Sequence, residues 1–133
     1  MRIDGGCHCG FINYEGEADP ATAAICNCTD CQKLSGSAFR TVIPVASATF
    51  KLTGEPTIYV KTGDSGNKRQ QAFCPRCGSP IFSAPPGDGP KTYFIRVGTV
   101  NQRDQLAPKS QIWARSQLRW VGTIAGIPKL EKQ

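Results

Sequence analysis

The densest group of reactive side chains is in CNCTDC, residues 26 to 31, where three cysteines fall within six residues. The chain carries seven cysteines, an odd number that cannot all pair as disulfides within one chain. The amino-terminal stretch MRIDGGCHCG has no apolar run typical of a signal peptide, and no stretch of about 18 apolar residues offers a membrane span. We therefore expect a cytoplasmic protein without membrane partners. In that reducing compartment, clustered cysteines indicate metal ligands or reactive thiols before disulfides.

Four of the cysteines form two pairs that suit one closed metal site. Cys74 and Cys77 lie in CPRCG, the pattern of a zinc knuckle, in which the glycine permits the turn that directs backbone N–H groups toward sulfur. Cys7 and Cys9 in CHCG are the simplest second pair. This segment must bend, because on a regular strand the two side chains would lie about 6.6 Å apart. We predict a structural zinc bound by four sulfurs at about 2.3 Å, joining the first ten residues to the seventies.

The other three cysteines, Cys26, Cys28 and Cys31, are close enough in sequence to bind one ion together. Three protein ligands leave a fourth coordination position open, and an open position distinguishes catalytic from structural zinc. Two alternatives stay open. One of the three could complete a different four-ligand set, with the others as ordinary buried thiols. Alternatively, Cys28 and Cys31 could form a redox pair, although the sequence lacks the βαβ setting of a thioredoxin and a third cysteine crowds the motif.

The net charge suggests a nucleic-acid partner at first, but the charge pattern argues against one. The formal charge is +6 and the pI is about 9.1. If all seven cysteines bound two zinc ions as thiolates, the net charge would fall from +6 to +3. Lysines and arginines are scattered, with no run of five or six and no interleaved aromatic residues. A mildly positive surface instead suits a small anionic substrate.

The length of 133 residues predicts one domain over residues 1–133, and the residue pattern predicts an all-β fold. Fourteen glycines and ten prolines divide the chain into short segments rich in β-branched and aromatic residues, several with the alternation of half-buried strands. The expected strands are FINYEG at 11–16, AFRTVIPV at 38–45, ATFKL at 48–52, TIYVK at 57–61, QQAF at 70–73, PIFSA at 80–84, TYFIRVG at 92–98, QIWA at 111–114 and LRWVG at 118–122.

One short helix is expected at TDCQKLSG, residues 29–36. Thr29 can cap the start of the helix, Gln32 can complete a capping box, and Gly36 is a natural left-handed stop. Cys31 would lie in the first turn, where free N–H groups and the helix dipole stabilise a thiolate. The helix would therefore favour both metal binding and reactivity of this cysteine.

Five motifs together resemble a known family. They are GGCHCG at 5–10, CNCTDCQKLSGSAF at 26–39, FCPRCGSPIF at 73–82, VGTVN at 97–101 and IWARSQLRWV at 112–121. In order and spacing they resemble the glutathione-dependent formaldehyde-activating family, which also includes centromere protein V. The resemblance implies a β-tent fold of short antiparallel sheets, a structural zinc at the four-cysteine set and a catalytic zinc at Cys26, Cys28 and Cys31. It also implies addition of glutathione, as cosubstrate, to formaldehyde to give S-(hydroxymethyl)glutathione, a carbon–sulfur lyase reaction written in reverse.

The chain departs from many relatives at four positions, none of them a cysteine ligand. Asn27 and Gln111 stand where many relatives have histidine, and Asn101 and Gln102 stand near a position that is often acidic. These differences bear on substrate choice and on proton transfer. The only histidine, His8, lies between two expected structural ligands and is not expected to act as a general base.

The chemistry of an open three-thiolate zinc also follows from the residues themselves. Its free position suits a soft ligand such as a substrate thiol, which binds as a thiolate and can attack a small carbonyl such as formaldehyde. Water, Lys33 or Ser35 would then have to transfer protons.

Glutathione has two carboxylates, which call for charged donors near the cysteines. The candidates closest in sequence are Lys33, Ser35, Ser37 and Arg40, and further candidates on expected strands are Arg96 and Arg115. Trp113 and Trp120 could line the pocket, although a strand tryptophan more often belongs to the core.

Three classes of function are therefore compatible with these residues. The first is a zinc enzyme acting on glutathione and a small carbonyl. The second is a two-zinc module that binds protein or nucleic acid, which requires a fourth ligand on the second zinc. The third is a thiol redox or metal-buffering protein, whose cysteines would cycle between dithiol and disulfide or yield zinc readily. The odd number of cysteines favours the first.

Overall fold

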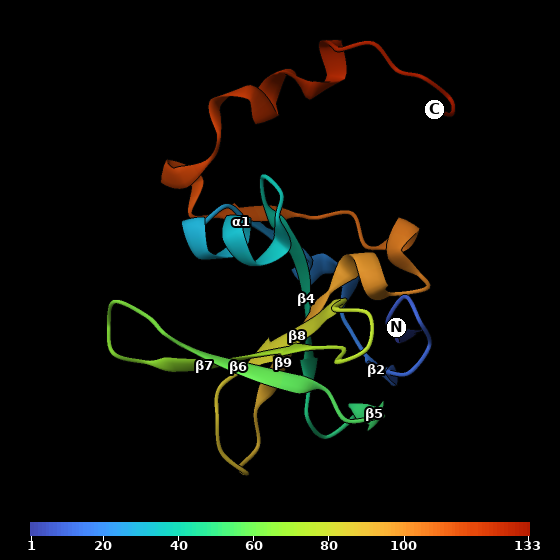
Figure 1. The fold of residues 1–133 in the computed structure, drawn as a ribbon, viewed down its shortest axis with the longest axis vertical. Coiled ribbons are helices and arrows are strands. Elements are labelled where there is room, and N and C mark those ends of the chain that lie inside the picture. The colour runs from blue at the N-terminus through green and yellow to red at the C-terminus, as the bar shows by residue number, and fades with distance from the viewer.

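The structure is a computed structural model that describes residues 1–133, and it confirms a mainly β fold (Figure 1). The one α-helix is α1(Thr29–Ser35). Five 3-10 segments are η1(Pro20–Thr22), η2(Val97–Thr99), η3(Arg103–Gln105), η4(Ala114–Ser116) and η5(Arg119–Gly126). The strands are β1(Arg2–Gly6), β2(Asn13–Glu17), β3(Ala24–Cys26), β4(Arg40–Ala46), β5(Lys51–Thr53), β6(Thr57–Thr62), β7(Lys68–Phe73), β8(Pro80–Ala84), β9(Thr92–Arg96) and β10(Ser110–Ile112). None of the helical segments combines the length and the apolar character that a membrane-spanning helix requires.

The strands form two sheets. The smaller sheet has the order β1-β2-β5 and is antiparallel. The larger sheet has the order β10-β3-β4-β9-β8-β7-β6, in which β10 pairs with β3 in parallel and the remaining neighbours are antiparallel. Strands from the middle and the end of the chain therefore lie beside β3, which carries the first of the three clustered cysteines.

The hydrophobic core joins both sheets. On the larger sheet, the register aligns Ile43, Ile95, Phe82 and Ala72 in one row across four strands, and all four are buried. They belong to one cluster of buried residues that also includes Ile3 of the smaller sheet. Since neighbouring residues on a strand point to opposite faces, this packing leaves the other face of the larger sheet free to line a site.

The N-cap of the helix lies one residue earlier than the sequence indicates, and Thr29 is the first helical residue. Cys28, not Thr29, is the N-cap, and its Sγ accepts a hydrogen bond from the backbone N–H of Cys31 at 3.2 Å. The amide of Gln32 does not close a capping box but bonds to the carbonyl oxygens of Asn27 and Ser116. A cysteine sulfur thus replaces the expected hydroxyl, because the chain must hold Cys28 and Cys31 side by side. The predicted stop is confirmed, with Gly36 in the left-handed region at φ 66°.

The tail differs from expectation. LRWVG is not a strand but lies in η5, whose turns are closed by local bonds such as Val121 N–H to the Leu118 carbonyl. The segment has no neighbouring strand to pair with, and Figure 1 shows the last residues lying away from both sheets. Trp113 and Trp120 are 55% and 56% exposed, so neither belongs to the core. Arg115 lies in η4 and not on a strand.

Two short strands were not expected from the sequence. β1 contains two glycines, and β3 has only three residues. Neither has the alternation or length that marks a strand, so their pairing partners decide their conformation. The other eight expected segments each overlap an observed strand.

Candidate metal centres and the adjoining cavity

The four cysteines of the knuckle pairs meet in space. The Sγ of Cys9 lies 3.6 Å from that of Cys7 and 3.7 Å from that of Cys74, and all four sulfurs, including that of Cys77, lie within 4.8 Å of one another. Four sulfurs arranged tetrahedrally at about 2.3 Å from one zinc ion are separated by about 3.8 Å. Since an all-sulfur, four-ligand set is typical of structural zinc, the donor set and its spacing fit that ion.

The local backbone explains how the two pairs bend. β1 ends at Gly6, so the CHCG segment is a turn and not a strand, with Gly10 in the left-handed region at φ 86°. Gly78 does the same for the second pair at φ 78°. Backbone N–H groups point to sulfur, that of Ile12 to Cys7 at 3.2 Å and that of Arg76 to Cys74 at 3.4 Å. These donors favour thiolates, the form that binds metal.

The three remaining cysteines also converge. Cys26 ends β3, Cys28 caps α1, and Cys31 lies in the first turn of α1. Their sulfurs lie within 4.8 Å of one another, and His, Asp or Glu adds no fourth ligand to the group. Hydrogen bonding from the Cys31 thiol lowers the pKa of Cys26 to about 5 and holds the pKa of Cys31 well above its usual range. Three soft donors at this separation fit one zinc ion with a coordination position left for another ligand.

A cavity of about 290 Å³ lies beside this three-cysteine group, and the register of the larger sheet explains its lining. Ile112, Cys26 and Arg40 are Cα partners across β10, β3 and β4. Val42, two residues after Arg40, pairs with Arg96 of β9. These side chains lie on the face opposite the core and line the cavity. Four strands and α1 thus build one wall around the cysteines.

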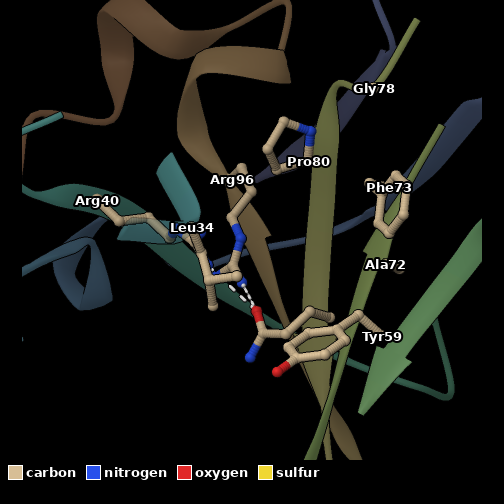
Figure 2. A pocket seen from close by; sticks show the side chains of 9 residues that line it. Leu34, Arg40, Tyr59, Ala72, Phe73, Gly78, Pro80 and Arg96 are labelled. Carbon is tan, nitrogen blue, oxygen red and sulfur yellow. Dashed lines mark hydrogen bonds between the residues drawn. The ribbon is translucent and has the colours of Figure 1, made fainter. Parts of the chain in front are cut away.

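The cavity is strongly cationic. Arg40 and Arg96 are 6% and 7% exposed, and both donate to the side-chain oxygen of Gln71, at 3.2 and 2.7 Å. Dashed lines in Figure 2 mark these two bonds. Arg69 donates to Ser83 at 3.4 Å and stacks on a phenylalanine ring. The arginine wall of the cavity consists of Arg40, Arg69 and Arg96. None of the three forms a salt bridge, and the Nε of Arg96 is buried without any hydrogen-bond partner.

Burial lowers the pKa of all three arginines, and at Arg96 repulsion from neighbouring arginines adds to it. Burial, together with the charge of Arg40, lowers the pKa of Arg96 to about 9, so its guanidinium remains charged at neutral pH. Burial also lowers the pKa of Arg40, whereas the charges of Cys31, Cys28 and Cys26 oppose that change. The arginines and the cysteines therefore act on one another electrostatically within one small cavity.

Two further hollows adjoin this cavity on different sides. One has a volume of about 410 Å³ and shares Cys28, Asp30, Lys61 and Trp113 with the cavity. Here Lys61 and Asp30 form a salt bridge of 2.6 Å that connects β6 to α1. The other, also about 410 Å³, shares residues of the arginine wall and appears in Figure 2. The cavity thus connects a hollow beside Cys28 and Trp113 with another beside Arg40 and Arg96.

Only some of the residues that the sequence suggested for substrate binding line the cavity. Arg40 lines the cavity, and so does Arg96. Lys33, Ser35 and Ser37 are exposed and are not among the residues that line it. The hydroxyl of Ser35 bonds to the end of its own helix, accepting from the Ser37 amide at 3.2 Å. A role for these three residues in binding glutathione stays a prediction.

The positions that depart from many relatives have structural partners here. Asn27 is fully buried and donates from its side chain to Gln111 at 3.1 Å, so two of the departures bond to each other. Asn101 and Gln102 both donate to the carboxylate of Asp4, at 2.8 and 3.1 Å. These residues hold the segments after β3 and β9 in place, and none of them lines the cavity.

Sequence reasoning missed Lys61, Arg69, Gln71 and Ser83, which come from β6, β7 and β8. A weak signal existed for Gln71, which lies on the expected strand 70–73, whereas Arg69 precedes that segment and joins it only in the observed strand β7. Their proximity to CNCTDC, however, depends on the order of strands in the larger sheet. The local sequence of β6, β7 and β8 does not specify that order.

Comparisons with known proteins agree with this architecture. The structure resembles a crystal structure of a Rhodobacter sphaeroides protein with a TM-score of 0.60, at 22% sequence identity, covering 81% of this chain and 98% of that chain. At that identity the likeness supports the fold alone. Residues 2–116 match the family described as glutathione-dependent formaldehyde-activating enzyme, a span that includes all seven cysteines and every residue of the cavity. The chain therefore belongs to the glutathione-dependent formaldehyde-activating enzyme family.

Proposed function

We propose that this protein is a zinc-dependent enzyme of the S-(hydroxymethyl)glutathione synthase type, which adds the sulfur of glutathione to formaldehyde or a related small carbonyl. The observation that carries the proposal is the three-cysteine group, which has no fourth protein ligand and lines a cavity. Family membership supports the same activity. In this proposal Cys7, Cys9, Cys74 and Cys77 hold a structural zinc, and Cys26, Cys28 and Cys31 hold a catalytic one.

The metal and the protein contribute different parts of the chemistry. When bound, the catalytic zinc would supply a coordination position for a thiol and would lower the pKa of that thiol. The cationic wall of the cavity favours anionic over neutral forms of any group that enters, because unpaired guanidinium groups lie in a poorly solvated site. Arg40 and Arg96 are positioned for this role by their bonds to Gln71.

The reaction balances without an oxidant or reductant. A carbon–sulfur bond forms between the thiol sulfur and the carbonyl carbon as the sulfur–hydrogen bond breaks. The π electrons of the carbonyl move to its oxygen, which takes up one proton, so the product is S-(hydroxymethyl)glutathione. The reverse reaction cleaves the carbon–sulfur bond, as expected of a lyase.

The test compares wild type with Cys28→Ser. Because thiols also add to formaldehyde without a catalyst, the assay is two-dimensional exchange NMR, which measures the interconversion rate of glutathione and its adduct at equilibrium. We expect zinc-loaded wild type to accelerate exchange above the uncatalysed rate and Cys28→Ser to return it to that rate. Serine can still cap α1, so the far-ultraviolet circular dichroism spectrum should not change.

Zinc content provides the control. Wild type should contain two zinc ions per chain, and Cys28→Ser should contain one. Full activity in Cys28→Ser would contradict the catalytic assignment. A wild type with two zinc ions and no acceleration would favour a binding module, whereas reversible oxidation of the group to a disulfide would favour a redox protein.

A further inference from the structure

Trp113 has a backbone conformation that a bulky residue rarely adopts. Its φ of 56° and ψ of 40° lie in the left-handed region, and every other residue of the chain with a positive φ is a glycine. A large side chain in that region is strained, because its Cβ crowds the backbone. Such strain persists only where the surrounding structure maintains it, and it is typical of functional sites.

The segment that carries the three-cysteine group holds Trp113 in this conformation. The carbonyl oxygen of Ile112 accepts a hydrogen bond from the backbone N–H of Asn27 at 3.1 Å. The carbonyl oxygen of Ser116 accepts one from the side chain of Gln32 at 3.0 Å. Both donors are direct sequence neighbours of the clustered cysteines. The backbone on either side of Trp113 is therefore tied to that group.

The indole ring gains little within the chain to offset this strain. Trp113 is 55% exposed, is absent from the hydrophobic core, and belongs to no aromatic pair. It lines the cavity beside Cys28 and the hollow that adjoins it. A glycine would adopt the same backbone without strain. The ring is therefore placed to contact a ligand and not to stabilise the fold.

The cavity is too small for the whole of an extended glutathione molecule. Its volume of about 290 Å³ corresponds to a sphere about 8 Å across, at the small end of ligand sites. An extended tripeptide spans about 10 Å. The thiol of glutathione belongs to its central residue, so one arm extends from each side of that residue. When the sulfur lies among the cysteines, the arms must extend beyond the cavity.

The two hollows that adjoin the cavity offer one space for each arm. Each has a volume of about 410 Å³ and shares part of its lining with the cavity, but the two share no residue with each other. One lies beside Arg40 and Arg96 and appears in Figure 2, and the other lies beside Cys28 and Trp113. An arm that enters the second hollow passes Trp113.

We propose that Trp113 is a substrate-binding residue whose indole ring packs against one arm of glutathione, so that the site prefers glutathione to thiols without such an arm. This inference rests on the proposed thiol addition and does not depend on which arm lies in which hollow. A rigid aromatic ring supplies a large contact area at a low entropic cost, and its backbone is fixed before binding. Because the ring contacts a part of glutathione that does not react, it acts on binding and not on the chemical step.

The first experiment follows tryptophan fluorescence as glutathione is added to the zinc-loaded full chain. Trp113 and Trp120 are the only tryptophans and are almost equally exposed, but Trp120 does not line the cavity. Trp120→Phe leaves Trp113 as the single reporter, and Trp113→Phe leaves Trp120. We expect glutathione to shift the emission of Trp120→Phe to shorter wavelength, because the ring loses contact with water, and to leave that of Trp113→Phe unchanged. Unchanged emission in both variants would overturn the proposal.

The second experiment compares the affinities for glutathione and 2-mercaptoethanol, a thiol without arms, by isothermal titration calorimetry. Trp113→Gly should weaken glutathione binding about threefold to tenfold, the range for one aromatic contact, and should change 2-mercaptoethanol binding by less than about twofold. The matched control, Trp120→Gly, should change neither. In the exchange assay, Trp113→Gly should raise the glutathione concentration at half-saturation and leave the maximal rate unchanged. Equal weakening of both thiols would overturn the proposal and make Trp113 a support of the cysteine group.

Protein stability distinguishes ligand binding from a structural role of the ring. Trp113→Gly removes both the ring and the strain, whereas Trp113→Ala removes the ring and keeps the strain. We expect a urea midpoint for Trp113→Gly that is no lower than that of wild type, and one for Trp113→Ala about 0.5 M below that of Trp113→Gly. A midpoint of Trp113→Gly below that of wild type would overturn the proposal, because the ring would then stabilise the fold.

The failure of the proposed function would look different. A shift of Trp113 emission by glutathione, without acceleration of exchange by wild type, would refute the thiol addition and uphold the contact between Trp113 and the thiol. Accelerated exchange that is the same in wild type and Trp113→Gly at every glutathione concentration would refute the contact alone.

Discussion

The double variant Cys9→Ser with Cys77→Ser should destabilise the protein only because it loses a cross-link. The two substitutions remove the exposed cysteines of the four-cysteine group. Both side chains are exposed, so neither substitution leaves a core cavity, whereas Cys7 and Cys74 remain in the core. The cross-link is long, since Cys9 and Cys74 are 65 positions apart in sequence. Metal removal therefore releases a large loop in the unfolded chain.

The magnitude follows from the entropy of loop closure. A covalent cross-link that closes a loop of about 66 residues stabilises a protein by about 4 kcal/mol at 25 °C on the chain-entropy relation, and one that closes a loop of about 6 residues by about 2 kcal/mol. A zinc ion that stays on the thiolates of the unfolded chain acts in the same way. The matched control is Cys28→Ser with Cys31→Ser, which removes two thiolates from the group that spans residues 26–31. We expect the first double variant to lose about 2 kcal/mol more than the control.

The assay is urea unfolding of zinc-loaded protein under reducing conditions, followed by far-ultraviolet circular dichroism. With a slope of about 2 kcal/mol per molar urea, loss of about 4 kcal/mol lowers the midpoint by about 2 M. Treatment with EDTA should lower the wild-type midpoint similarly and change that of Cys9→Ser with Cys77→Ser much less. A double variant whose midpoint equals that of zinc-loaded wild type would refute the cross-link.

Two further predictions concern the segment β1. Gly5→Ala should lower the free energy of unfolding in urea by about 1–3 kcal/mol, because a Cβ would overlap with the carbonyl oxygen of Thr99. The control is Gly89→Ala, which has open space around it and should change stability by less than about 0.5 kcal/mol. Equal effects of the two substitutions would contradict the close approach of Gly5 to Thr99. The hydrogen bond from Asn101 lowers the pKa of Asp4 below its usual value, so this carboxylate contributes stability above its unfolded pKa that is lost as pH falls through its folded pKa. Asp4→Asn should therefore show a shallower loss of unfolding free energy than wild type between about pH 5 and pH 2, measured by urea midpoints at each pH. A parallel decline in both proteins would mean that Asp4 does not contribute.

Local patterns in the sequence were enough for the cysteine partition and for much of the fold. The spacing of CHCG, CPRCG and CNCTDC separates the seven cysteines into four and three, and the sulfurs meet in those same two groups. Alternation and turn residues located eight of the ten strands, and Gly36 marked the end of α1. These features depend on contacts between residues near in sequence, or on backbone preferences that single residues carry.

The arginine wall depended on contacts that the sequence does not display. Arg40 was a candidate because it is close to CNCTDC, but Arg69 and Gln71 reach the cysteines only through the strand order β3-β4-β9-β8-β7. Cys28 replaced Thr29 as the cap for a similar reason, because grouping the sulfurs fixes the backbone there. Residue types, spacing and caps act over a few positions and can be recognised from sequence alone. Sheet order and register bring together residues that are tens of positions apart, and only the tertiary structure decides which of them share a face.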